Sequence, residues 1–357
     1  FEAVLRFWLD RGVDGFRIDV AHSLIKVADL RDQVRTSDER TAPVLTEEGG
    51  LIDPHAEDEP MWDQPEVHEI YRRWHRVLAE YSGDRMTVAE AWTRTAESMA
   101  RYVRPDELSQ SFNFAWLSAG WSADAFRKVI EDTFSALAEV GSPPTWVLSN
   151  HDMIRHVTRY GGGTRGLARA RAATLTMLGL PGSAYLYQGE ELGLEEVEVP
   201  VEARQDPITL RTGEKGRDGC RVPLPWSGQV PPYGFGPASP GTQPWLPQPM
   251  DWAPLTAAAQ ADDPDSTLAF YRRALRLRRT LPAECITLGS DPQRVLSFTR
   301  GDVLVVVNTG TEPIDLKSIN PESINPAHGE VLISSGPLPV PGQLPADTAV
   351  WVRLPQP

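Results

Sequence analysis

The sequence predicts an α/β fold built from parallel βα units and followed by a small antiparallel β domain. Helical apolar patterns alternate with short apolar runs along most of the chain, which is typical of βα units. These runs mostly lack the alternation of a half-buried strand, as expected when both faces of a sheet are covered. After residue 281 the pattern changes to short strands joined by tight turns.

The elements of the α/β part recur in one order. Apolar residues at helical spacing start at Val4 and stop before Gly12, and a strand is expected from Gly15 to Asp19. A period of two places Arg17 on the same face of this strand as Asp19. Three further helix and strand pairs are expected, namely 66–81 with 86–89, 123–140 with 145–148, and 165–178 with 184–187.

The last third of the chain begins with a proline-rich segment. Between Val222 and Pro254, ten prolines accompany three tryptophans, which predicts a long ordered loop. A helix at 266–281 follows, then a hairpin at 295–299 and 303–307 and an alternating strand at 349–354. We therefore predict two domains, 1–283 with the loop at 222–254, and 284–357, an antiparallel β-sandwich.

Composition restricts the classes of function. The 357 residues are 41% apolar and 24% charged, and 35 Lys and Arg against 49 Asp and Glu give a net charge of −14. This charge disfavours nucleic acid and anionic membranes as partners and suits a small neutral substrate. The longest uncharged stretch, 172–187, is too short and too broken by Gly and Pro to span a bilayer. Cys220 and Cys285 form no metal-ligand or disulfide pattern, which favours a reducing, cytoplasmic compartment.

Three acidic residues stand directly after predicted strands: Asp19, Glu90 and Asp152. Enzymes built as βα barrels carry their catalytic groups at this end of the strands, although carboxylates there also cap helices or are simply solvated. We expect Arg17 to pair with Asp19 and keep it charged, as a nucleophile requires. Apolar neighbours should raise the pKa of Glu90, which suits a proton donor. An ionised and a protonated acid are the pair that retaining glycoside hydrolysis uses.

Three segments carry a resemblance to a known family. Residues 15–22 (GFRIDVAH), 88–92 (VAEAW) and 148–152 (LSNHD) resemble, in order and spacing, signature segments of the α-amylase family of glycoside hydrolases, family thirteen. Residues 187–193 (YQGEELG) and 216–226 (GRDGCRVPLPW) look like its α-glucosidase and oligo-1,6-glucosidase branch. The resemblance implies a (β/α)8 TIM barrel and a retaining α-glucosidase that removes terminal glucose from short oligosaccharides.

The same resemblance implies roles for single residues. Asp19 would be the nucleophile, Glu90 the general acid/base, and Asp152 the acid that holds the hydroxyls of the distorted glucosyl ring. The remaining four residues would contact substrate: Arg17 and His151 in the same subsite, Arg221 at the non-reducing end, and His22 at the leaving group. No metal ligand and no required cofactor is expected.

The family's earlier Asn-His signature has no counterpart here. We therefore expect the chain to be a C-terminal excerpt with about five of the eight βα units, a partial barrel. A structural calcium, which some family members hold, would lie in the segments that precede this excerpt. The sequence leaves oligomeric state and linkage preference open.

Two other functions fit the same residues. A transferring or isomerising relative, of the trehalose or isomaltulose synthase type, would use the same three acids. A catalytically silent family member would be expected to have lost one of them, and none is lost here. Product analysis with maltose or sucrose separates hydrolysis from rearrangement.

Overall fold

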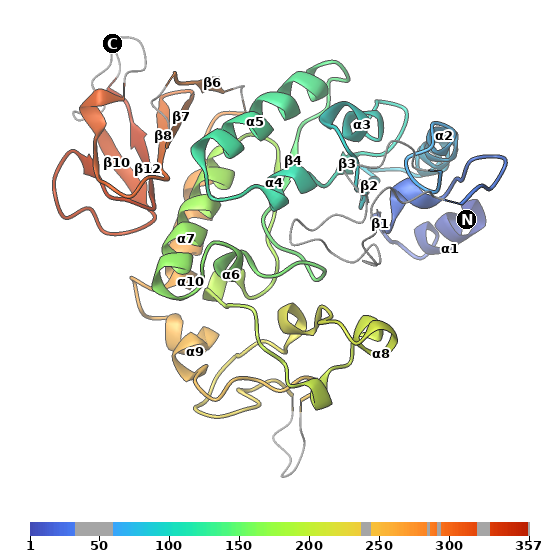
Figure 1. Ribbon diagram of the computed structural model, residues 1–357. Helices are drawn as coiled ribbons and strands as arrows, with labels where there is room; N and C mark the ends of the chain where they lie inside the picture. Colours follow the sequence, from blue (N-terminus) through green and yellow to red (C-terminus); the bar gives the residue numbers. More distant parts are fainter. Residues whose placement is uncertain (33–59, 237–243, 284–285, 291–293, 320–328, 356–357) are drawn as a thin grey trace. The chain divides into compact units, whose positions relative to one another are not determined.

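A computed structural model describes residues 1–32, 60–236, 244–283, 286–290, 294–319 and 329–355 (Figure 1). The chain forms two compact units, one of Phe1–Ser118 and Lys128–Trp146, the other of Ala119–Arg127 and Val147–Pro357. The predicted domain boundary adjoins residues 284–285, which lie outside the described residues, so this division of the chain stays a prediction.

The first unit contains a sheet of three parallel strands in the order β1 (Gly15–Ile18), β2 (Met86–Ala89) and β3 (Gln110–Ser111). The parallel arrangement expected from the alternation of strands and helices is confirmed for β1 and β2. In their register Ile18 pairs with Ala89, so the residue that follows each strand emerges at the same edge of the sheet. These next residues are Asp19 and Glu90.

Helices cover this sheet through a shared apolar core. Leu5 and Leu9 of the first helix are buried in it, whereas Val4 and Trp8 remain about half exposed, so only part of the expected apolar face is packed in the described residues. The helical elements of the first unit are α1 (Glu2–Leu9), η1 (Ala21–Ser23), α2 (Val67–Leu78), α3 (Ala96–Arg101) and α4 (Phe114–Ser118). Residues of α5 (Ala123–Ala138) and β4 (Thr145–Val147) belong to both units.

The second unit begins with α6 (His156–Arg159) and α7 (Gly163–Gly179), and its first complete strand is β5 (Ser183–Tyr185). In the described residues that follow, short helical turns succeed one another, as the proline content predicts. They are η2 (Glu190–Leu192), η3 (Val201–Ala203), α8 (Pro207–Thr212), η4 (Asp218–Arg221), η5 (Ala253–Leu255) and α9 (Ala257–Gln260), before the longer α10 (Thr267–Arg278).

An antiparallel sheet ends the chain, with strand order β10-β12-β8-β7-β6. The hairpin expected from the sequence is confirmed, since Arg300 pairs with Val303 across a two-residue turn in which Gly301 has a φ of 60°. The strands are β6 (Thr287–Leu288), β7 (Val295–Arg300), β8 (Val303–Asn308), β10 (Glu330–Ser334) and β12 (Thr348–Arg353). A second sheet pairs β9 (Ile314–Asp315) with β11 (Gln343–Leu344), and η6 (Leu316–Ser318) follows β9.

The sheet is anchored on α7 within the second unit. The indole Nε1 of Trp351 donates to the carbonyl oxygen of Leu175 at 3.1 Å. Asp347 accepts hydrogen bonds from Trp121, Arg165 and Arg169 at 2.7 to 3.0 Å. These three donors hold Asp347, the residue before β12, against the preceding α/β part of this unit.

Candidate active site

Two of the three predicted acids lie at the ends of neighbouring strands in the first unit. Asp19 follows β1 and Glu90 follows β2. The backbone continues the parallel ladder past the strands, with the amide of Glu90 donating to the carbonyl of Ile18 at 2.9 Å. The amide of Ala21 in turn donates to the carbonyl of Glu90 at 2.8 Å. The two acids are therefore held by one continuous backbone network.

Glu90 is buried, with 4% of its surface exposed, and both of its carboxyl oxygens accept a hydrogen bond. The amide of Val20 reaches one oxygen at 2.6 Å, and the indole Nε1 of Trp92 reaches the other at 2.7 Å. Burial raises the pKa of Glu90 to about 7, although the Val20 amide, Arg17 and Trp92 act in the opposite direction. The direction predicted from the apolar neighbours is confirmed.

The amide of Val20 can reach Glu90 because of an unusual turn. Val20 has φ 46° and ψ 45°, the left-handed region that a β-branched residue rarely adopts. Backbone strain of this kind persists only where the surrounding contacts enforce it, here the bonds from the amides of Val20 and Ala21 to Glu90, just beyond the ends of β1 and β2. The strained residue stands between Asp19 and the helical turn η1.

Asp19 differs from Glu90 in being open to solvent, with 72% of its side chain exposed. Arg17 donates to Asp19 at 3.1 Å, so the two side chains share a face of β1 as the sequence predicts. The guanidinium of Arg17 also lies 5.7 Å from the ring centroid of Phe112, which limits the orientations it can take. The exposed carboxylate is therefore accompanied by a cation placed by an aromatic ring.

His22, predicted to contact the leaving group, is buried in the helical turn η1. Its ring has no exposed surface, stacks on Trp62 at 5.0 Å between centroids, and accepts a hydrogen bond at Nδ1 from the amide of Trp92 at 3.4 Å. Burial lowers the pKa of His22 to about 4. In this structure His22 supports Trp92, the partner of Glu90, and its predicted contact with a leaving group stays a prediction.

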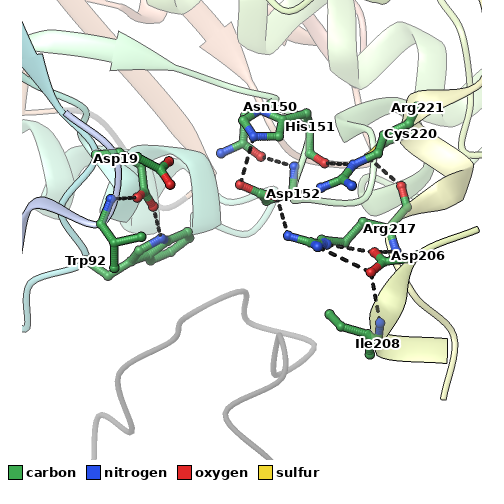
Figure 2. A network of polar contacts seen from close by, with 12 residues as sticks. Asp19, Trp92, Asn150, His151, Asp152, Asp206, Ile208, Arg217, Cys220 and Arg221 are labelled. Atoms are coloured by element: carbon green, nitrogen blue, oxygen red, sulfur yellow. Dashed lines mark hydrogen bonds and ion pairs between the residues drawn. The ribbon is translucent and has the colours of Figure 1, made fainter. Parts of the chain in front are cut away.

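The third acid, Asp152, lies in the second unit, beside two arginines that are far from it in the sequence (Figure 2). Its Oδ1 accepts from Nη1 of Arg217 at 2.8 Å and from Nη2 of Arg221 at 2.9 Å. Its Oδ2 lies 3.3 Å from Nε2 of His151. The backbone amide of Asp152 is fixed by the side chain of Asn150 at 2.9 Å.

Arg221 connects two of the predicted residues. Besides Asp152 it donates through Nε to the backbone carbonyl of His151 at 2.7 Å. The structure thus brings Asp152, His151 and Arg221 together in the second unit, while Asp19, Glu90, Arg17 and His22 lie in the first.

Several contributing residues were not singled out from the sequence. Trp92 and the amide of Val20 bind the carboxyl of Glu90, and Arg217 and Asp206 form a chain of contacts to Asp152 (Figure 2). Arg217 lies in the segment 216–226, where its charge was a usable signal. Asp206 lies in no motif, and only the structure identifies it.

Within the described ranges, no group of three or more His, Cys, Asp or Glu residues is arranged to hold a metal ion. The described part of the chain also contains no helix that is both long and apolar enough to cross a membrane. A structural calcium of the kind that some family members hold would lie in segments outside this sequence and stays untested.

Comparison with known proteins identifies the class. Residues 1–285 match the model of the alpha amylase catalytic domain, so the chain belongs to this family. A crystal structure of an alpha-glucosyl transfer enzyme superposes with a TM-score of 0.79 and 30% identity, covering 98% of this chain and 66% of that one. The shared fold is a TIM barrel with a C-terminal β domain, whereas the expectation of a partial barrel stays a prediction.

Curated relatives indicate which branch of the family this chain resembles. A probable alpha-glucosidase of Rhizobium meliloti is 35% identical over 294 residues, which is 79% of this chain and 51% of the relative. An oligo-1,6-glucosidase of Saccharomyces cerevisiae is 29% identical over 379 residues, 90% of this chain and 61% of the relative. The chain thus spans between half and two thirds of the length of these relatives. The resemblance to the α-glucosidase and oligo-1,6-glucosidase branch is confirmed.

Proposed function

We propose that this protein is a retaining α-glucosidase that removes terminal α-linked glucose from short, neutral oligosaccharides. The observation that carries the proposal is the contrast between two acids at the ends of paired parallel strands. Asp19 is exposed and ion-paired, whereas Glu90 is buried with a pKa raised to about 7. A charged nucleophile and a protonated acid are what the first step of retaining hydrolysis requires.

The reaction proceeds in two displacements. The Asp19 carboxylate attacks the anomeric carbon, the bond to the leaving oxygen breaks, and the Glu90 carboxyl gives its proton to that oxygen. Water then attacks the glucosyl ester and gives a proton to the Glu90 carboxylate, and Asp19 is released as a carboxylate. Two inversions leave the released glucose in its original anomeric configuration.

The remaining predicted residues orient the sugar. Asp152, held by two guanidinium groups, would accept hydrogen bonds from the hydroxyls of the distorted glucosyl ring. The family resemblance implies substrate contacts for Arg17 and His151 and a place at the non-reducing end for Arg221. The segment 216–226, which resembles the rim of α-glucosidase pockets, favours action at chain ends over internal cleavage.

Nuclear magnetic resonance of the products tests this proposal. With p-nitrophenyl α-glucoside, whose single sugar is the transferred residue, glucose should appear first as the α anomer, and initial appearance of the β anomer would contradict retention. Rates on maltose and on an end-blocked maltoheptaoside should differ strongly in favour of maltose. Efficient cleavage of the blocked chain would instead indicate an endo-acting enzyme.

Glucosyl transfer is the second candidate, and one observation favours it. The structure with a TM-score of 0.79 belongs to an alpha-glucosyl transfer enzyme, with which this chain shares 30% identity. Transfer uses the same first displacement, after which a sugar hydroxyl replaces water. Stoichiometric free glucose from maltose or sucrose supports hydrolysis, and a new or rearranged saccharide supports transfer. A silent family member would release neither.

A further inference from the structure

Asp206 is a buried carboxylate at the beginning of α8, and no sequence motif includes it. Its side chain has no exposed surface. Its two oxygens accept hydrogen bonds from the backbone amides of Ile208 at 3.0 Å and Arg217 at 2.8 Å. A buried charge of this kind is tolerated only when it is paired and hydrogen-bonded.

The guanidinium of Arg217 supplies the ion pair. Its Nε donates to Oδ2 of Asp206 at 2.8 Å, and its Nη2 faces Oδ1 at 3.3 Å. This is the forked arrangement that fixes a guanidinium plane as well as its position. Burial by itself would raise the pKa of Asp206, but the bonds from Arg217 and the two backbone amides outweigh it and lower that pKa.

The backbone allows this close approach because position 216 is a glycine. A Cβ at Gly216 would lie 2.6 Å from the Cβ of Asp206, a distance that side chains do not tolerate. The neighbouring Asp218 accepts from the backbone amides of Gln205 and Asp206 at 2.8 and 3.0 Å. The segments around Asp206 and Arg217 thus each donate backbone hydrogen bonds to a carboxylate of the other.

Arg217 has one terminal nitrogen left for a further partner. This Nη1 donates to Oδ1 of Asp152 at 2.8 Å, the same oxygen that Arg221 reaches at 2.9 Å (Figure 2). Because both guanidinium groups take Oδ1, the carboxylate plane of Asp152 is set and Oδ2 is directed to the side of His151, 3.3 Å away.

We propose that Asp206 is a positioning residue for the reaction: it holds the Arg217 guanidinium so that Arg217 and Arg221 together fix the orientation of the Asp152 carboxylate. The proposal rests on the proposed glucosidase function only for its kinetic consequence. Asp206 itself contacts no reacting atom. Without its carboxylate, the long side chain of Arg217 would regain rotational freedom, and Asp152 would lose one of its two fixed donors.

A structural role is the alternative, since the Oδ1 of Asp206 also caps α8 through Ile208. Asp206→Asn separates the two roles. Asparagine keeps the oxygen that caps the helix but replaces the other with an NH2 group, which cannot accept from Arg217. Glu198→Gln is the matched control, because it also neutralises a carboxylate of the same region, one paired with Lys215 and Arg204 and not with Arg217.

A double-mutant cycle measures the kinetic consequence. With p-nitrophenyl α-glucoside, Asp206→Asn should lower kcat/KM by about 10- to 100-fold, and Glu198→Gln should leave it within about twofold. In an Arg217→Ala background the further effect of Asp206→Asn should shrink to about twofold, since the residue acts through Arg217. Multiplying effects in the double variant, or a single Asp206→Asn variant within twofold of the parent, would overturn the proposal.

A spectroscopic measurement tests the contact between Asp206 and Arg217 without relying on enzyme activity. The Nε–H signal of Arg217, assigned by its loss in Arg217→Lys, should exchange slowly in the parent and in Glu198→Gln. It should shift and exchange fast in Asp206→Asn; an unchanged signal there contradicts the proposal.

If Asp206→Asn does not fold, Arg217→Lys replaces it in the kinetic test, and activity within twofold of the parent again contradicts the proposal. A parent without glycosidase activity would refute the proposed function alone.

Discussion

Glu90 in the first unit and Asp152 in the second are carboxyl groups with contrasting burial and hydrogen-bond partners. Both follow a strand, and the sequence presents them alike. Glu90 is buried and receives a backbone amide and an indole, both neutral donors, so burial dominates and its pKa rises to about 7. Asp152 is instead bound by the guanidinium groups of Arg217 and Arg221. Burial suits a residue that must carry a proton, whereas two guanidinium groups on one oxygen fix the orientation of a carboxylate.

The largest expected effect concerns Asp19, which is exposed to solvent and paired with Arg17. Asp19→Asn keeps the shape of the side chain but removes the nucleophile, so kcat/KM should fall by more than about 1,000-fold while the melting temperature changes little. Steady-state kinetics and thermal unfolding check this. A variant that keeps more than about a tenth of the parent kcat/KM would reject Asp19 as nucleophile.

The second prediction tests the proton carried by Glu90. Glu90→Gln should lower the rate on maltose by about 100-fold or more, because the leaving sugar needs a proton. The first step with p-nitrophenyl α-glucoside should be much less affected, since nitrophenolate leaves unaided. The ratio of the two losses, measured in pre-steady-state experiments, is the decisive quantity. Equal losses on both substrates would show that Glu90 is not the acid.

The same variant should affect stability through the raised pKa of Glu90. A carboxyl whose pKa is 4.5 when unfolded and about 7 when folded binds its proton more tightly in the folded state. Its contribution is therefore fully favourable below about pH 4.5 and is lost as pH rises towards 7. Relative to the parent, Glu90→Gln should gain about 1 to 3 kcal/mol between pH 4.5 and pH 8. Urea unfolding at both values measures this gain, and a pH-independent difference would contradict it.

The smallest expected effects concern the hydrogen-bond partners of Glu90 and Asp152. Trp92→Phe removes the indole donor that stabilises the ionised form of Glu90, so the descending limb of the kcat/KM profile should move to higher pH, by less than about one unit. Arg221→Lys should lower kcat/KM by about tenfold through Asp152 and leave that limb in place. A shift in the Arg221→Lys variant instead would mean that the limb does not report Glu90.

Local patterns allowed much of the fold to be predicted. The strand at Met86–Ala89 and the hairpin around Gly301 lie where the sequence places them, because apolar runs and turn residues act over a few neighbouring positions. The short α3, β3 and α8 were not predicted. Elements of two to six residues offer too few positions for a period to show.

The sequence alone predicts which residues carry the chemistry: three acids at the ends of predicted strands, with Arg17 two positions before Asp19. The surroundings of each acid are visible only in the folded chain. The pKa of Glu90 depends on burial and on the amide of Val20, 70 positions away in the sequence. The burial of His22 and the chain of contacts from Asp206 to Asp152 likewise join residues distant in sequence. Desolvation and ion pairing depend on distances in space, which local sequence patterns do not encode.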